Sequence, residues 1–166
     1  MNKNTYAYFR LSNTNLSLLL CLVSLISSAQ NLNFSHLGLD EGLPQETIHC
    51  IDKDKNGFIW LGTSDGAVRY DGHDFFVPQP DANSGLDIAG YRIGTILAKD
   101  NFVYVGTGQN GLIRYDIYNE SIVQVGDTNT NCTRLIAYND FILAAFYNNG
   151  VAIIDQFGTF HSNNFE

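Results

Sequence analysis

The sequence has few positive charges and few prolines, and these shortages limit what the protein is able to do. Only nine Lys and Arg residues stand against seventeen Asp and Glu residues. An acidic surface repels phosphate backbones and anionic lipids, so we expect no nucleic-acid partner. Charged residues make up 16% and hydrophobic residues 45% of the chain, which argues against disorder and supplies a packed core. With three Pro, fifteen Gly and 13% aromatic residues, the composition favours strands joined by glycine turns over helices.

Long hydrophobic runs are also scarce, and the only prominent one lies near the N-terminus. It covers residues 16–26, about eleven residues, too few to span a bilayer comfortably. Basic residues precede this run and Ser-Ser-Ala follows it, which predicts a signal peptide over residues 1–29. A short N-terminal membrane anchor is the alternative. The mature chain would keep seven basic and seventeen acidic residues, a net charge of −10.

Three segments of the mature chain repeat one pattern, namely residues 60–71, 104–116 and 142–155. Each has a hydrophobic pair, then Gly or Ala, Thr or Ala, a polar turn containing Gly, and a few residues that end in Asp. The first two aligned glycines lie 44 residues apart, and the next step is 38 residues, to Ala144. A period of about 40 residues with several short strands predicts the blades of a β-propeller.

Each repeat contains four short apolar runs separated by tight turns. The predicted fold class is therefore all-β: a partial β-propeller over residues 30–166, with four-stranded antiparallel blades and about three blades present. We expect blade one at 46–77, blade two at 92–125 and blade three at 132–162. The expected strands are 47–52, 58–63, 67–70 and 74–77; 93–98, 102–107, 112–115 and 121–125; and 134–138, 141–146, 151–154 and 159–161.

The second strand of each blade is predicted to pack on both faces. Residues 58–61 are all apolar, whereas a surface hairpin would alternate apolar and polar residues. Gly62 and Gly106 follow these strands, and a strand glycine fits a place where another backbone or sheet comes close.

The opening and first blade carry an unusual combination of motifs, and these resemble the two-component regulator propeller repeats. The resemblance is close over residues 32–77, extends over 93–125 and loosens at 132–161. The residues that carry it are Gly-Leu-Pro at 42–44, Gly-Phe-Ile-Trp-Leu-Gly-Thr at 57–63 and Gly-Ala-Val-Arg-Tyr-Asp-Gly at 66–72.

The resemblance implies the periplasmic sensing part of a hybrid two-component regulator. Such sensors have seven-bladed propellers, so the blades here would form an incomplete ring, with residues 32–37 as the closing strand of the last blade. The resemblance also implies an oligosaccharide ligand, the remaining propeller blades as partners, and a full-length histidine kinase in the inner membrane. A homodimer is left open. Alternatives from other classes are a stand-alone exported carbohydrate-binding or adhesion module, and a propeller enzyme.

No catalytic, cofactor-binding or metal-binding residue is predicted. Residues 52–57 open like a calcium-binding EF-hand loop, but Thr63 stands where a bidentate Glu is needed, so we expect a polar hairpin turn and at most a weak surface cation site. Thr63 and Thr107 are expected to be structural, and residues 106–108 lack the Lys of a phosphate loop. No metal-ligand spacing relates the four histidines, His36, His49, His73 and His161.

Two repeated arginines are the remaining candidates for binding. Arg69 and Arg114 occupy equivalent positions beside Tyr70 and Tyr115. They could contact a sugar or a carboxylate, since the guanidinium fork suits both, or pair with an acidic neighbour as part of the repeat. We favour the acidic neighbour.

The single tryptophan and the two mature-chain cysteines allow specific predictions. Trp60 is expected to be buried between blades one and two, with its indole N–H on a backbone carbonyl; a sugar-stacking role is the alternative. Cys50 and Cys132 lie ten residues before Trp60 and the aligned Ile142, which places both in inner strands of blades separated by a whole blade. They should therefore be free thiols.

Overall fold

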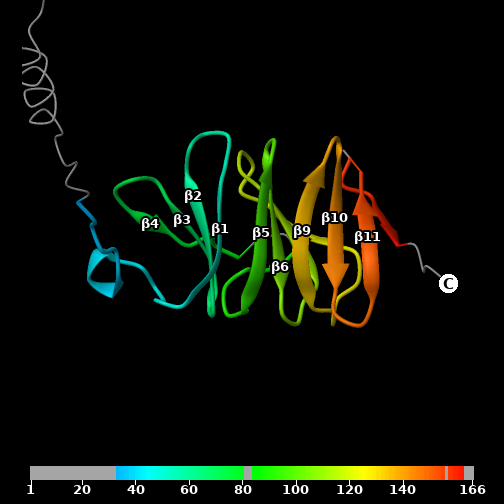
Figure 1. Cartoon of the computed structure of the whole chain (residues 1–166), viewed down its shortest axis with the longest axis horizontal. Helices are drawn as coiled ribbons and strands as arrows, with labels where there is room; N and C mark the ends of the chain where they lie inside the picture. Colours follow the sequence, from blue (N-terminus) through cyan, green and yellow to red (C-terminus); the bar gives the residue numbers. More distant parts are fainter. Residues whose placement is uncertain (1–32, 81–83, 156, 163–166) are drawn as a thin grey trace, which may run out of the picture. The chain divides into compact units, whose positions relative to one another are not determined.

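The computed structural model describes residues 33–80, 84–155 and 157–162, and its main elements are three four-stranded sheets (Figure 1). The chain divides into a unit of residues 1–36 and a unit of residues 37–166, and all three sheets lie in the second unit. The predicted signal peptide lies outside the described residues and stays a prediction. None of the helices in the described ranges is long and apolar enough to cross a membrane.

Each sheet is one blade, and consecutive strands within it pair antiparallel in chain order. Every predicted strand is confirmed with its ends within two residues. Blade one contains β1 (Ile48–Lys53), β2 (Ile59–Thr63), β3 (Gly66–Tyr70) and β4 (Phe75–Phe76). Blade two contains β5 (Ile93–Lys99), β6 (Phe102–Thr107), β7 (Leu112–Asp116) and β8 (Ile122–Val125). Blade three contains β9 (Cys132–Tyr138), β10 (Phe141–Phe146), β11 (Gly150–Ile154) and β12 (Phe160–Ser162).

The first strands of successive blades lie side by side, which makes β1, β5 and β9 the inner strands of the partial ring (Figure 1). Each inner strand has a bulge near its start, at His49, Gly94 and Thr133, where one residue is left out of the pairing with the second strand. Blade two lies between its neighbours, and its second strand buries Val103, Tyr104 and Val105 on both faces. The prediction that blades pack through both faces is therefore confirmed.

The two strand glycines allow neighbouring blades to approach closely. A Cβ on Gly62 would lie 2.3 Å from the Sγ of Cys50 and 2.8 Å from Ile93 Cγ2 of blade two. A Cβ on Gly106 would lie 2.5 Å from the Thr95 side chain and 3.0 Å from the Cys132 carbonyl oxygen of blade three. Carbon atoms do not approach that closely without repulsion, so any side chain here would push two blades apart.

The alignment of the third repeat is wrong by one residue. In blades one and two, the glycine of the second strand pairs with the residue that follows the turn glycine. In blade three, the residue that follows the turn glycine is Val151, and it pairs with Ala145. Ala145 therefore occupies the place of the strand glycine. Leu143, not Ile142, therefore corresponds to Trp60. Because side chains alternate between faces along a strand, this shift of one residue exchanges the two faces of the blade. Ile142 and Ala144 are buried, as this register requires.

The other face of blade three is the more open one. Its side chains belong to alternate residues of three neighbouring strands, and several large apolar ones among them are exposed: Ile136, Tyr138, Phe141 and Val151. Within the described residues no further sheet covers this face.

The opening segment precedes blade one. A short 3-10 helix (Leu39–Glu41) leads to Gly42, where an added Cβ would lie 3.9 Å from the Phe75 ring, and to Leu43, which is buried. Residues 33–38 form no strand in the structure. The predicted closing strand at 32–37 would pair with a last blade that these residues do not include, so it stays a prediction.

Candidate functional site

A buried carboxylate organises the first turn of blade one. Asp54 is 2% exposed, and its Oδ1 accepts hydrogen bonds from the backbone N–H groups of Asn56 (2.9 Å) and Phe58 (3.1 Å). Its Oδ2 accepts a hydrogen bond from Trp60 Nε1 at 2.9 Å. The expected backbone carbonyl partner of Trp60 is therefore wrong. The signal was present in the sequence, since an Asp that begins a glycine turn can bond both the turn and a side chain beyond it.

The same geometry shows how the EF-hand-like sequence forms a polar hairpin turn. Asp52 accepts one hydrogen bond from the Lys53 N–H and another, at 2.8 Å, from the Ala98 N–H of blade two. Both carboxylates of the segment thus face N–H donors. The predicted polar turn is confirmed, and among the described residues no group of three His, Cys, Asp or Glu side chains is placed to hold a metal ion.

Trp60 is fully buried at the seam between blades one and two, as predicted. Its ring lies 5.4 Å from the ring of Tyr115 in blade two, with an interplanar angle of 56°. This geometry is a favourable tilted contact between aromatic rings. A ring with no exposed surface is not a platform on which a sugar stacks.

The repeated arginines stack on aromatic rings. The Arg69 guanidinium lies 4.8 Å from the centroid of Phe58 and 4.6 Å from that of Phe76, and Arg114 lies 4.5 Å from that of Phe102. Neither arginine forms an ion pair within the described part of the chain, so the expected pairing with an acidic neighbour is wrong. The cation–π contacts replace it, because a half-buried guanidinium is attracted to the face of an aromatic ring.

Two polar atoms at the seam of blades one and two are buried without a hydrogen-bond partner, namely Arg69 Nε and the Tyr115 hydroxyl oxygen. Trp60 pairs directly with Arg69, so both side chains lie on the face of blade one that Tyr115 covers. Burial raises the pKa of Tyr115, the negative charge of Glu120 adds to that rise, and the positive charge of Arg69 opposes it. We name the group Phe58, Trp60, Arg69, Phe76 and Tyr115 the seam cluster.

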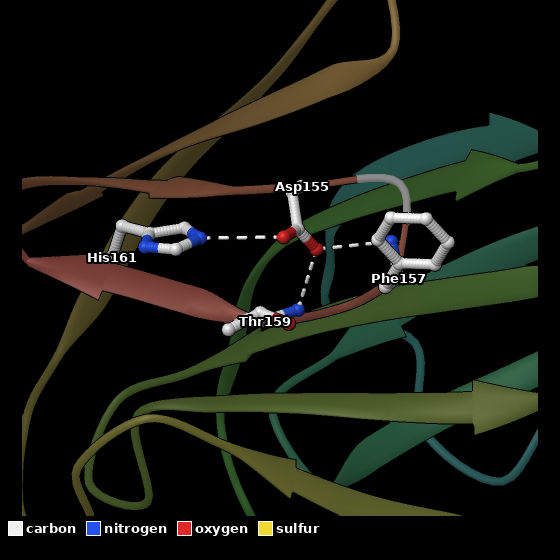
Figure 2. Close-up of polar contacts among 4 residues, drawn as sticks. All are labelled: Asp155, Phe157, Thr159 and His161. Atoms are coloured by element: carbon white, nitrogen blue, oxygen red, sulfur yellow. Dashed lines mark hydrogen bonds and ion pairs between the residues drawn. The ribbon is translucent and has the colours of Figure 1, made fainter.

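A second repeated feature is the turn between the third and fourth strands. Asp155 begins it in blade three and accepts hydrogen bonds from the N–H groups of Phe157 (2.9 Å) and Thr159 (2.8 Å), while His161 Nε2 lies 3.3 Å from its other oxygen (Figure 2). These contacts, led by the Thr159 N–H, hold the pKa of Asp155 below its usual value. Asp71 and Asp116 begin the same turn in blades one and two, accept similar N–H bonds, and also have lowered pKa values. The recurrence in all three blades indicates a structural turn.

The two threonines and two of the histidines singled out in the sequence form hydrogen bonds in turns and strands. Thr63 and Thr107 each donate a hydrogen bond to the carbonyl of the turn glycine and accept one from a turn N–H, which confirms the structural prediction. His49 bonds the Ser64 hydroxyl at 2.9 Å, and His73 contributes its backbone N–H to Asp71. His36 lies in the first unit of the chain.

Both cysteines are free thiols in the inner strands of blades one and three, as predicted. Their positions in the repeat differ, however. Cys50 pairs with Gly62, whereas Cys132 pairs with Phe146 and corresponds to Ile93 of blade two. The turn after the inner strand is shorter in blade three, so counting ten residues back from each second strand does not give equivalent positions. Burial raises the pKa of Cys50 to about 11 and that of Cys132 to about 12.

The fold and the seams between sheets define the class: the chain is a partial β-propeller. Comparison with known proteins then identifies the repeat. The family described as two component regulator propeller matches residues 42–65, which cover the Gly-Leu-Pro opening, the Asp54 turn and Trp60. Residues 42–65 thus match a two-component regulator propeller repeat, and the resemblance seen in the sequence is confirmed over these residues.

Part of the chain is also similar to a curated protein and to solved structures. A curated relative, Histidine kinase P4 of Formosa agariphila, is 37% identical over 60 residues, which are 35% of this chain and 4% of the relative. The extracellular domain assigned to the hybrid two component system BT3049 of B. thetaiotaomicron has a TM-score of 0.67 at 22% identity, over 78% of this chain and 20% of that chain. The extracellular domain assigned to the one component system BT4673 of B. thetaiotaomicron gives 0.58 at 24% identity, over 74% and 17%. This chain thus spans only a small part of the proteins it matches, and these two structures support the fold.

Proposed function

We propose that this chain is the first part of a sensor propeller that faces the periplasm, binds an extracellular oligosaccharide and passes the signal to a kinase in the same polypeptide. The observation that carries the proposal is the two-component regulator propeller repeat at residues 42–65, located in a folded blade of the expected architecture. The relatives with matching sequence or fold are named as a histidine kinase and as extracellular domains of two-component and one-component systems.

The propeller's proposed role is binding without catalysis. Its repeated polar residues are engaged in turns, as Asp54 and Asp155 are, and these contacts hold the blades in shape. We therefore expect that incubating the mature chain with candidate oligosaccharides leaves them intact in chromatography. A cleaved product would favour a propeller enzyme.

The deciding experiment is to sequence the transcript beyond the codon for Glu166. The proposal expects further propeller repeats, a membrane-spanning segment and a kinase in the same reading frame. A stop codon directly after this chain, with the protein recovered from the periplasm or the medium, would refute the sensor and favour the stand-alone exported binding module. Cell fractionation of a tagged full-length protein tests the proposed location separately.

A further inference from the structure

The seam cluster differs from a purely structural junction because it leaves two buried polar atoms unsatisfied. A buried donor or acceptor without a partner destabilises a protein by about 1–3 kcal/mol, and folded proteins contain few of them. Here Arg69 and Tyr115 belong to facing sheets: Arg69 pairs with Trp60 across the strands of blade one, and the Tyr115 ring lies 5.4 Å from the Trp60 ring. Two such groups at one seam provide hydrogen-bonding atoms for a ligand that carries oxygen.

The repeat itself provides an internal comparison. At the next seam Arg114 pairs with Tyr104 and stacks on Phe102, and neither Arg114 nor Tyr104 has a buried polar atom without a hydrogen-bond partner. The residue of blade three in the place of Tyr115 is Ile154, which is buried and has no polar side-chain atom. The unsatisfied pair is therefore specific to blades one and two and is not a consequence of the propeller repeat.

The chemistry of the two groups defines what fits between them. The Nε of Arg is only a donor, so its partner must supply an oxygen lone pair; a Tyr hydroxyl can both donate and accept. A carboxylate is the partner that matches a guanidinium best, because it accepts two parallel hydrogen bonds and neutralises the charge. Arg69 has no carboxylate partner in the described residues, and its two flanking Phe rings already hold the guanidinium in place. A held guanidinium loses little further freedom when it binds an anion.

The acidic groups around the cluster form no ion pair with it. Glu120, Asp116 and Asp71 are close enough for their charges to act on Tyr115 or Arg69. Glu120 is exposed and forms no ion pair among the described residues, and the carboxylates of Asp71 and Asp116 accept hydrogen bonds from backbone N–H groups of their own turns. The guanidinium remains half-buried at the outer side of the seam, and the half-buried rings of Phe58 and Phe76 offer apolar surface beside it.

We propose that the seam between blades one and two is a binding site for an acidic sugar, in which Arg69 receives the carboxylate and the Tyr115 hydroxyl bonds an oxygen of the same ligand. This inference rests on the proposed oligosaccharide-sensing function and adds the class of ligand and the residues that bind it. A neutral sugar offers hydroxyls but no charge, so it gains much less from an unpaired guanidinium than an acidic sugar does.

The test uses the full chain and its only tryptophan as the reporter, because Trp60 lies 5.4 Å from Tyr115. Fluorescence is titrated with sodium glucuronate, with glucose as the neutral analogue, and with sodium chloride at matched ionic strength. We expect a saturable change with glucuronate alone. A response that is equal for glucose or chloride, or no saturable response to glucuronate because water alone fills the seam, would overturn the inference.

Two matched variants separate binding from folding. Arg69→Lys should weaken glucuronate binding at least about tenfold, because a point charge replaces the bidentate fork, whereas Arg114→Lys should change it less than about twofold. Tyr115→Phe keeps the ring, so it should weaken binding while leaving the Tm of the unliganded protein unchanged or higher. Equal effects of the two Lys variants, or a lower Tm for Tyr115→Phe, would contradict the site.

The outcomes also separate this inference from the proposed sensor function. Binding of neutral oligosaccharides with no glucuronate effect would refute the acidic-sugar site and leave the sensor proposal standing. A stop codon after Glu166 together with Arg69-dependent glucuronate binding would refute the sensor and keep the site.

Discussion

Replacing Asp54 should destabilise blade one more than its place in a polar turn suggests. In Asp54→Ala, the fully buried indole N–H of Trp60 loses its only acceptor, which costs about 1–3 kcal/mol. The N–H groups of Asn56 and Phe58 lose theirs as well, but both residues are more exposed and water can replace part of those bonds. We therefore expect a total loss of about 2–4 kcal/mol in the free energy of unfolding.

The size of the indole contribution can be isolated by a double-mutant cycle. Trp60→Phe removes the N–H donor while keeping an aromatic ring, and Asp54→Ala removes the acceptor. Combined, the two changes should cost less than the sum of their separate effects, with a coupling of about 1–2 kcal/mol. Trp60→Ala should cost about 3–5 kcal/mol because it also removes the packed ring.

The assay is pulse proteolysis in urea at nanomolar concentration, which limits association of open blade faces. Asp140→Ala, an exposed Asp in the corresponding turn of blade three, is the control, and its effect should stay within about 0.5 kcal/mol. If Asp54→Ala is no more damaging than this control, or if the cycle shows no coupling, the reasoning about the buried carboxylate is refuted.

Four other predictions follow from the seams and turns. An NMR titration should give Asp155 a pKa below the ordinary value of 3.8. The stabilisation by the Asp155 carboxylate should be complete above pH 3.8 and should be lost as the pH falls through the lower folded pKa. Asp155→Asn should remove this part of the pH dependence, and an unshifted pKa would contradict the prediction. At pH 8 the thiols of Cys50 and Cys132 should react slowly in the folded chain, because burial raises their pKa values to about 11 and about 12. Both thiols should react once the unreduced protein is denatured. If neither thiol reacts after denaturation, the two cysteines form a disulfide. Gly62→Ala should lower stability by about 1–3 kcal/mol through its collision with the Cys50 sulfur, and Cys50→Ala should recover part of that loss. Mature residues 30–166 alone should associate at micromolar concentration, because blade three exposes an apolar face; a monomer that unfolds cooperatively in ultracentrifugation and melting experiments would show otherwise.

The repeat was sufficient to predict the fold from the sequence. The hydrophobic runs, the turn glycines and the spacing of Gly62 and Gly106 set the number and order of the strands, because each blade encodes its own local pattern. The burial of Trp60 also followed, since a strand with apolar residues on both faces has to pack on both.

The tertiary structure decided the face and the partner of individual side chains. In blade three both faces of the second strand are apolar, so the sequence pattern did not distinguish Ala144 from Ala145 as the residue that replaces the glycine, and only the pairing with Val151 settled it. The sequence also did not predict the contacts of Arg69, because one of the two Phe rings that hold it lies just before β2 and the other lies in β4. Strand alternation fixes which side chains share a face, but the depth of burial at a seam depends on the neighbouring blade. That is why the unsatisfied Arg69 and Tyr115 atoms became visible only when the two sheets were packed together.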